Sequence, residues 1–223
     1  MQTVKPSILT KRWVVILLAS LCATLWGSAY PSIKLGYELF GVGADDTAAK
    51  LAFAGLRFTL AGLLVLVFRS LQRGPKMAIR SLTAHSSLQI LLLGLLQTTI
   101  HYYFFYVGVS YTTGAKSSIL NSSSVFFSAV LAHLVYSNDH ISFRKGLGIL
   151  LGFVSVILVN IEPNLSLSFR LQGEGFVVIS AFLTSLCALY SKRISKQVDP
   201  VLLTALQLFS GGFILLMIAL GMG

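Results

Sequence analysis

Seven long apolar stretches follow one another along the chain, and polar or charged segments separate them. A bilayer core requires about 20 apolar residues per helix, and in lipid only helices or closed barrels satisfy every backbone polar group. The pattern therefore predicts an all-α, polytopic transmembrane helical bundle. The predicted spans cover residues 13–34, 48–69, 87–109, 114–136, 144–161, 173–193 and 199–221.

The composition supports lipid as the solvent around these helices. Hydrophobic residues make up 55% of the chain and charged residues only 11%, whereas about 25% of a typical soluble domain is charged. The lipid bilayer is therefore the first predicted partner.

The basic residues lie mostly on alternate connections, and this bias predicts the orientation of the chain. Flanking Lys and Arg residues stay on the cytoplasmic side of a membrane. The sequence thus predicts a multi-pass protein of the cell (cytoplasmic) membrane, with residues 1–12 as a cytoplasmic N-terminus. The net charge of +10 follows from this topology, and no binding of nucleic acid is predicted. The residues assigned to the cytoplasmic side are Lys5, Lys11, Arg12, Arg69, Arg73, Lys76, Arg80, Arg144, Lys145, Lys192, Arg193 and Lys196.

A faint internal repeat relates the beginning of the chain to its end. Residues 57–64 align with residues 207–214 at a constant offset of 150 residues, and residues 25–30 resemble residues 186–190 at an offset of 160 or 161. A chance alignment of helices rich in Leu, Ala and Gly is the alternative. The paired offsets favour a true repeat.

The orientation of the two copies follows from the number of spans. The first copy contains five spans, an odd number, so the second copy begins on the opposite side of the membrane. Inverted repeats recur in transporters, whose substrate sites lie near the midplane between the copies. The repeat therefore favours a transport function.

Four motifs of the first five spans belong together. They are Trp26-Gly27-Ser28 with Lys34, Arg57-Phe58 with Ala61-Gly62, Gly114-Ala115-Lys116 to Asn121-Ser122-Ser123, and Gly146, Gly148 and Gly152. In these motifs the chain resembles the drug/metabolite transporter superfamily, EamA type, and the resemblance covers essentially its whole length. It implies an inner-membrane permease built from two inverted five-helix halves, often an exporter of metabolites or amino acids.

The resemblance also implies ten spans, whereas this chain contains seven. Residues 13–161 would then form the first five-helix repeat, and residues 173–223 the first two helices of an incomplete second repeat. Either the chain is a truncated product, or a partner supplies the remaining helices. A non-transporting, membrane-embedded fragment of a permease is thus the alternative function.

Polar side chains within the predicted spans are candidates for a substrate-binding site. Such residues are costly in lipid and usually face protein or a water-filled cavity. Residues four apart share a helix face, which pairs Trp26 with Tyr30 and Gln97 with His101. In the second copy of the repeat, Gln207 occupies the position that Arg57 occupies in the first copy. The predicted substrate-binding set is Trp26, Tyr30, Arg57, Gln97, His101, Asn121 and Gln207.

Arg57 and His101 each allow two interpretations. Arg57 offers a fixed positive charge for a carboxylate or phosphate, or it serves as a topological anchor bound to backbone carbonyls. His101 suits proton coupling because imidazole titrates near neutral pH, but a neutral histidine bound to neighbouring hydroxyls is the favoured interpretation. Residues 102–106 form an aromatic run toward the outer interface and predict a belt anchor.

Small residues predict close helix packing in the fourth and fifth spans. The serine-rich stretch 117–128 allows helices to approach each other and to hydrogen-bond. Gly148 and Gly152 form a small-xxx-small stripe, which indicates either packing within the chain or the interface of a homodimer.

Two other function classes are disfavoured by the sequence. An intramembrane enzyme needs clustered acids, a HExxH helix or a serine with a partnered base, and none of these motifs occurs. A heptahelical receptor has its N-terminus outside, whereas the basic bias here places it inside. The sequence therefore predicts a transporter with no catalytic residue, metal site or cofactor.

Overall fold

The computed structural model describes residues 11–43, 45–73, 82–136, 141–159 and 169–222. Three of the predicted cytoplasmic residues (Lys5, Lys76 and Arg80) lie outside the described residues, as do the last two positions of the predicted span 144–161.

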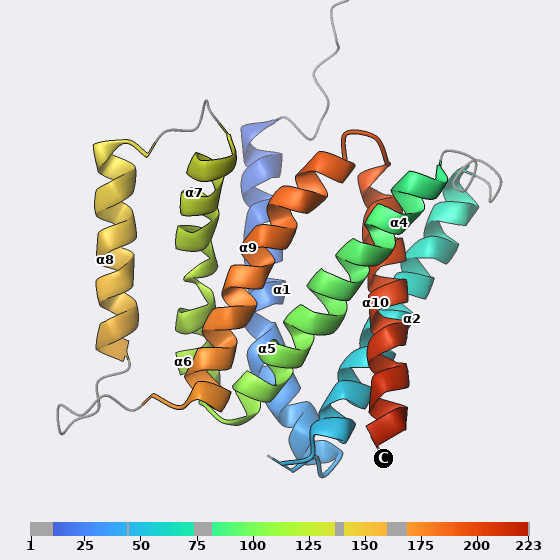
Figure 1. The fold of residues 1–223 in the computed structure, drawn as a ribbon, viewed down its shortest axis with the longest axis horizontal. Coiled ribbons are helices and arrows are strands. Elements are labelled where there is room, and N and C mark those ends of the chain that lie inside the picture. The colour runs from blue at the N-terminus through green and yellow to red at the C-terminus, as the bar shows by residue number, and fades with distance from the viewer. Residues whose placement is uncertain (1–10, 44, 74–81, 137–140, 160–168, 223) are drawn as a thin grey trace, which may run out of the picture. The chain divides into compact units, whose positions relative to one another are not determined.

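The described residues are helical almost throughout, and no strand occurs among them. Figure 1 shows these helices along the chain. In chain order the elements are α1 (Arg12–Leu39), α2 (Thr47–Arg73), α4 (Ala84–Leu93), η2 (Gly94–Ile100), α5 (His101–Ser110), α6 (Gly114–Asn121), α7 (Ser124–Val135), α8 (Phe143–Val159), η3 (Leu171–Gly175), α9 (Phe176–Ile194) and α10 (Pro200–Met222).

Six helical stretches of the described chain are long and apolar enough to cross a membrane. They cover Arg12–Leu39, Thr47–Gln72, Ala84–Ser110, Gly114–Val135, Leu171–Ile194 and Pro200–Met222. The prediction of an all-α polytopic bundle is therefore confirmed. The predicted span 144–161 corresponds to α8, of which 17 residues are described, and its crossing of the membrane stays a prediction.

The chain divides into two compact units, one ending at Gly41 and the other covering Val42–Gly223. Helix α1 is the described element of the first unit. It runs to Leu39, past the predicted end at residue 34, with Pro31 inside it. Lys34, the last residue of the predicted first span, therefore lies within this helix and not at its end.

Helices α2 and α10 form the most extensive contact of the second unit, and they run antiparallel. Gly55 lies against Leu216, Gly62 lies against Phe209, and Gly212 lies against Thr59. A Cβ atom at Gly212 would lie 2.6 Å from the backbone nitrogen of Thr59, which leaves no room for a side chain. Because no hydrophobic force drives helices together in lipid, van der Waals packing at such close backbone contacts supplies the attraction between α2 and α10.

The third helical stretch contacts α10 through a π-helix, η2, which lies between α4 and α5. Thr98 Oγ1 donates to the backbone oxygen of Gln207 (3.3 Å), and Thr99 Oγ1 donates to that of Gly211 (2.8 Å). Gly94 and Gly211 meet backbone to backbone. The wider π turn thus directs two consecutive threonines toward α10, and π turns of this kind are frequent at functional sites.

Helix α9 joins α5, α7 and α4 in the same unit. Gly108 of α5 lies against Val177, and Ser185 Oγ donates to the backbone oxygen of Ser124 on α7 (2.7 Å). The buried core at one end of the unit contains Ile90, Leu93, Cys187, Ile194, Val198, Leu202 and Leu203.

The predicted span 114–136 is interrupted in the structure. Helix α6 ends at Asn121, and α7 starts at Ser124. Between them the backbone forms tighter bonds, from Ser123 N to Leu120 O and from Val125 N to Ser122 O. The Ser122 hydroxyl also binds a carbonyl oxygen of the preceding turn, in competition with the helical backbone bonds. This break was not predicted from the serine-rich stretch.

We predict that Gly212→Ala destabilises the fold, because the added methyl group must displace the backbone of α2. Overpacking of this kind costs about 1–3 kcal/mol. Gly62→Ala should have a similar effect, since Gly62 meets the backbone of α10 in the same way. The measurement is the unfolding midpoint of the purified protein in mixed micelles.

Gly221→Ala is the matched control on α10, because nothing lies within 4 Å of a Cβ atom there. It should be neutral or stabilise by up to about 1 kcal/mol through helix propensity. Equal midpoints for Gly212→Ala and Gly221→Ala would contradict the close approach of α2 and α10.

Candidate functional site

Arg57 of α2 is bound to α5 through a tyrosine. Its Nη1 donates to the hydroxyl of Tyr106 (3.0 Å), and its guanidinium carbon lies 5.6 Å from the ring centre of Phe58. Tyr106 is fully buried, whereas Arg57 is exposed. Tyr106 therefore holds one terminal nitrogen of the guanidinium, and the exposed remainder is open to other groups.

The partner of Arg57 belongs to an aromatic cluster between α2 and α5, defined here as Phe53, Phe58, Tyr102, Phe105 and Tyr106. The rings of Phe58 and Tyr102 stack at 4.0 Å, and Tyr106 contacts the other four rings of the cluster at 5.8 to 6.3 Å. The predicted role of residues 102–106 as a belt anchor therefore does not extend to Tyr106, because Tyr106 packs inside the bundle.

His101 lies on the same aromatic cluster as Arg57. Its ring is 4.4 Å from that of Tyr102 and 6.0 Å from that of Phe105, and the residue is only 5% exposed. Arg57 and His101 thus contact different members of one aromatic cluster, Arg57 through Phe58 and Tyr106 and His101 through Tyr102 and Phe105. Gln97 lies one turn before His101, within η2.

Four of the predicted site residues carry a buried polar atom with no hydrogen-bond partner among the described residues. These atoms are Gln97 Oε1, His101 Nδ1, Asn121 Oδ1 and Gln207 Oε1. Most buried polar groups in proteins are hydrogen-bonded, and leaving one unpaired costs about 1–3 kcal/mol. Water or a solute is the natural partner for such atoms.

The structure brings some members of the predicted set together but not all. Gln207 lies on α10 directly opposite η2, since its backbone oxygen accepts from Thr98. Asn121 ends α6, which packs on α9, α8, α5 and η3. Trp26 and Tyr30 lie on α1, in the other unit, so their participation stays a prediction.

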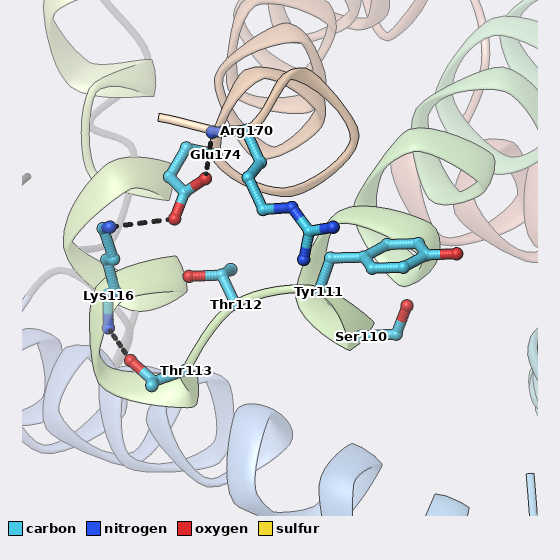
Figure 2. Close-up of a pocket in the computed structure, with 7 residues that line it drawn as sticks. All are labelled: Ser110, Tyr111, Thr112, Thr113, Lys116, Arg170 and Glu174. Atoms are coloured by element: carbon cyan, nitrogen blue, oxygen red, sulfur yellow. Dashed lines mark hydrogen bonds and ion pairs between the residues drawn. The ribbon is translucent and has the colours of Figure 1, made fainter. Parts of the chain in front are cut away.

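A second polar site, not predicted from the sequence, lies where α5, α6 and η3 meet (Figure 2). It is a cavity of about 390 Å³. Its lining residues are Ser110, Tyr111, Thr112, Thr113, Lys116, Arg170 and Glu174. We name it the Arg170 cavity.

An ion pair forms one wall of the Arg170 cavity. Lys116 Nζ lies 2.8 Å from Glu174 Oε1, and the backbone N–H of Arg170 donates to Glu174 Oε2 (2.8 Å). The sequence offered one signal for this pair, because Lys116 and Glu174 carry opposite charges. Both lie near the start of predicted spans (114–136 and 173–193) that begin on the non-cytoplasmic side when the N-terminus is cytoplasmic.

A different ion pair lies at the other end of the bundle. Arg69 Nη2 of α2 binds Asp199 Oδ2 (2.8 Å), and Asp199 Oδ1 accepts from the backbone N–H groups of Val201 and Leu202. Asp199 therefore both caps α10 and neutralises Arg69, which is 8% exposed.

No group of three or more His, Cys, Asp or Glu residues that could hold a metal ion occurs in the described part of the chain.

Comparison with known proteins identifies a family and distant relatives. The sequence profile of the EamA-like transporter family matches residues 13–161. The uncharacterized transporter YdfC of Bacillus subtilis is 24% identical over 214 residues, which cover 96% of this chain and 65% of YdfC. An uncharacterized transporter of Archaeoglobus fulgidus is 26% identical over 209 residues, covering 93% of this chain and 67% of that protein.

A further relative is an uncharacterized transporter of Methanothermobacter thermautotrophicus, 29% identical over 137 residues, or 60% of this chain and 40% of that protein. The chain thus spans about two-thirds or less of the length of these relatives. No solved structure matches the chain significantly.

Tyr111, in the connection between α5 and α6, yields a prediction on pH. Its hydroxyl donates to Asp45 Oδ1 (2.8 Å), and this hydrogen bond raises the pKa of Tyr111 above its usual range. A raised pKa in the folded state means that the hydrogen bond stabilises the fold below about pH 10, the ordinary value. That stabilisation is lost as the pH rises through the raised pKa.

The difference in tyrosinate absorbance between the parent and Tyr111→Phe reports the ionisation of Tyr111. We expect this difference to appear at a higher pH than the ionisation of an ordinary tyrosine. In an Asp45→Asn background the same difference titration should shift to lower pH. An unchanged titration after Asp45→Asn would contradict the assigned hydrogen bond.

Proposed function

The chain belongs to the EamA-like transporter family, and on this premise we propose that it acts as a permease for small polar or amphipathic solutes. The proposed location is the cell membrane, with the N-terminus in the cytoplasm, and export is the proposed direction. The earlier resemblance to this family is confirmed by the profile match. The chain is a multi-pass membrane protein, and the lipid bilayer is its solvent.

The contact between α2 and α10 supports the proposed inverted repeat. At the offset of 150 residues, Gly62 corresponds to Gly212 and Thr59 corresponds to Phe209. Gly62 lies against Phe209, and Gly212 lies against Thr59. The contact of Gly62 with Phe209 and the contact of Gly212 with Thr59 therefore involve the same two repeat positions, with the two copies exchanged. This exchange is expected for two elements related by a two-fold axis.

The unpartnered polar atoms carry the proposal of a solute pathway. Gln97, His101, Asn121 and Gln207 each bury a polar atom without a partner among the described residues. In a membrane bundle, such atoms are costly unless water or a passing solute binds them. Donors on a polar solute would supply the missing hydrogen bonds.

Arg57 is the proposed anchor for a carboxylate or phosphate on the solute. A guanidinium presents five N–H donors in a planar fork, and the fork of Arg57 is oriented by Tyr106. Trp26 and Tyr30 are proposed to contribute an aromatic surface from α1, with Gln207 as the repeat counterpart of Arg57.

A homodimer through the face of Gly148 and Gly152 remains a proposal. Gly152 lies against the ring of Phe126 on α7, so this part of the stripe packs within the chain. Nothing lies within 4 Å of a Cβ atom at Gly148, and this position is the open part of the proposed interface.

We predict that Arg57→Gln lowers solute flux about tenfold or more, because a lost charge-assisted hydrogen bond weakens binding by that order. Tyr106→Phe should lower flux less, since it removes only the orienting hydroxyl. The assay is efflux of radiolabelled amino acids and carboxylic acids from preloaded cells at matched expression.

Arg144→Gln is the matched control, because Arg144 is an exposed arginine at the start of α8. Flux in Arg57→Gln equal to that of Arg144→Gln would rule out the anchor role. An absence of flux in the unmodified chain, at normal expression and folding, would instead support the non-transporting fragment.

A further inference from the structure

The Arg170 cavity has the size of a small-molecule site and a polar lining. Its volume of about 390 Å³ lies within the range of roughly 300–1,000 Å³ that ligand pockets occupy. Figure 2 shows the side chains of Arg170, Glu174, Lys116 and Thr112 around the same space. They come from η3 and its preceding residue, from α6, and from the connection between α5 and α6.

Glu174 is the only carboxylate among the described residues of the lining, and groups of the chain already neutralise it. Lys116 binds one oxygen of Glu174, and the backbone N–H of Arg170 binds the other, both at 2.8 Å. The guanidinium of Arg170 is different, since no carboxylate of the described residues lies within ion-pair distance of it. Among the described residues, the lining therefore carries one positive charge without a carboxylate partner.

Tyr111 holds this guanidinium in place. The guanidinium carbon of Arg170 lies 5.8 Å from the ring centre of Tyr111, and Lys50 Nζ lies 5.0 Å from the same centre. The ring is itself tethered through its hydroxyl to Asp45. A guanidinium stacked on a fixed ring is oriented in advance, so it loses less entropy when it binds an anion.

We propose that the Arg170 cavity binds an oxyanion, namely the carboxylate of a small solute, in a bidentate contact with Arg170. The Thr112 hydroxyl lines the same space and offers a further hydrogen bond. Its place in transport, as a docking site at one end of the pathway, rests on the proposed permease function. The binding itself does not.

The same chemistry would suit the phosphate of an anionic lipid headgroup. The cavity lies at the end of three membrane-spanning stretches, where headgroups are found, and a guanidinium binds phosphate and carboxylate alike. The test therefore separates a dissolved anion from a lipid.

The experiment follows thermal unfolding of the purified full chain in nanodiscs of phosphatidylcholine. The signal is the reaction of a maleimide dye with Cys187, which is buried, in a Cys22→Ser background that removes the exposed thiol. Sodium acetate or inorganic phosphate is titrated against sodium chloride at constant ionic strength. A second set of nanodiscs contains phosphatidylglycerol.

The variants are Arg170→Gln and Arg170→Lys, with Arg193→Gln as the matched control. Arg193 is an exposed arginine at the opposite end of α9. Acetate should raise the unfolding temperature of the parent and of Arg193→Gln, and Arg170→Gln should need about tenfold more acetate for the same shift. Arg170→Lys keeps the charge but loses the planar fork of N–H donors. The acetate concentration that it needs for the same shift should lie between those of the parent and Arg170→Gln.

Stabilisation by phosphatidylglycerol alone, lost in Arg170→Gln, would support the oxyanion site with a lipid as its occupant. Equal responses of Arg170→Gln and Arg193→Gln to acetate, phosphate and phosphatidylglycerol would overturn the proposal. Since no flux is measured, this result is independent of the Arg57 experiment: the permease function can fail while the oxyanion site stands, and the reverse.

Discussion

The close approach of α2 and α10 is the contact on which the rest of the second unit depends. Lipid does not drive helices together as water does, so their association needs backbone proximity and hydrogen bonds. Gly55, Gly62 and Gly212 give that proximity, and Gly94 with Gly211 extends it to η2. Because α10 is held between α2 and η2, the polar residues of these elements are brought to neighbouring positions.

Some polar groups at the ends of the bundle are paired, whereas several polar atoms within it have no partner among the described residues. At one end Arg69 is paired with Asp199, and at the other Lys116 is paired with Glu174. Within the bundle, Gln97, His101 and Gln207 each bury a polar atom that has no hydrogen-bond partner among the described residues. A structure built for stability alone would pair these atoms or replace them, so their presence favours a role in binding.

The sequence predicted the helical architecture because apolar length and charge bias are local properties. It also predicted the relation between residues 57–64 and 207–214, which the reciprocal contacts of Gly62 and Gly212 support. The partner of Arg57 could not be predicted, since Tyr106 is one of several aromatic residues in a run and only packing selects it. The Arg170 cavity was missed because its residues are distant in sequence and each is ordinary for a membrane interface.

The antiparallel register of α2 and α10 is tested most directly by distances between spin labels in nanodiscs, with the native cysteines replaced. Labels at the exposed positions Leu71 and Val201 should lie close together, because both flank the pair of Arg69 and Asp199. Labels at Leu71 and Leu220 should be much farther apart, since 19 residues of helix span about 28 Å. Equal distances, or a shorter one for Leu71 and Leu220, would contradict the antiparallel contact and the inverted repeat inferred from it.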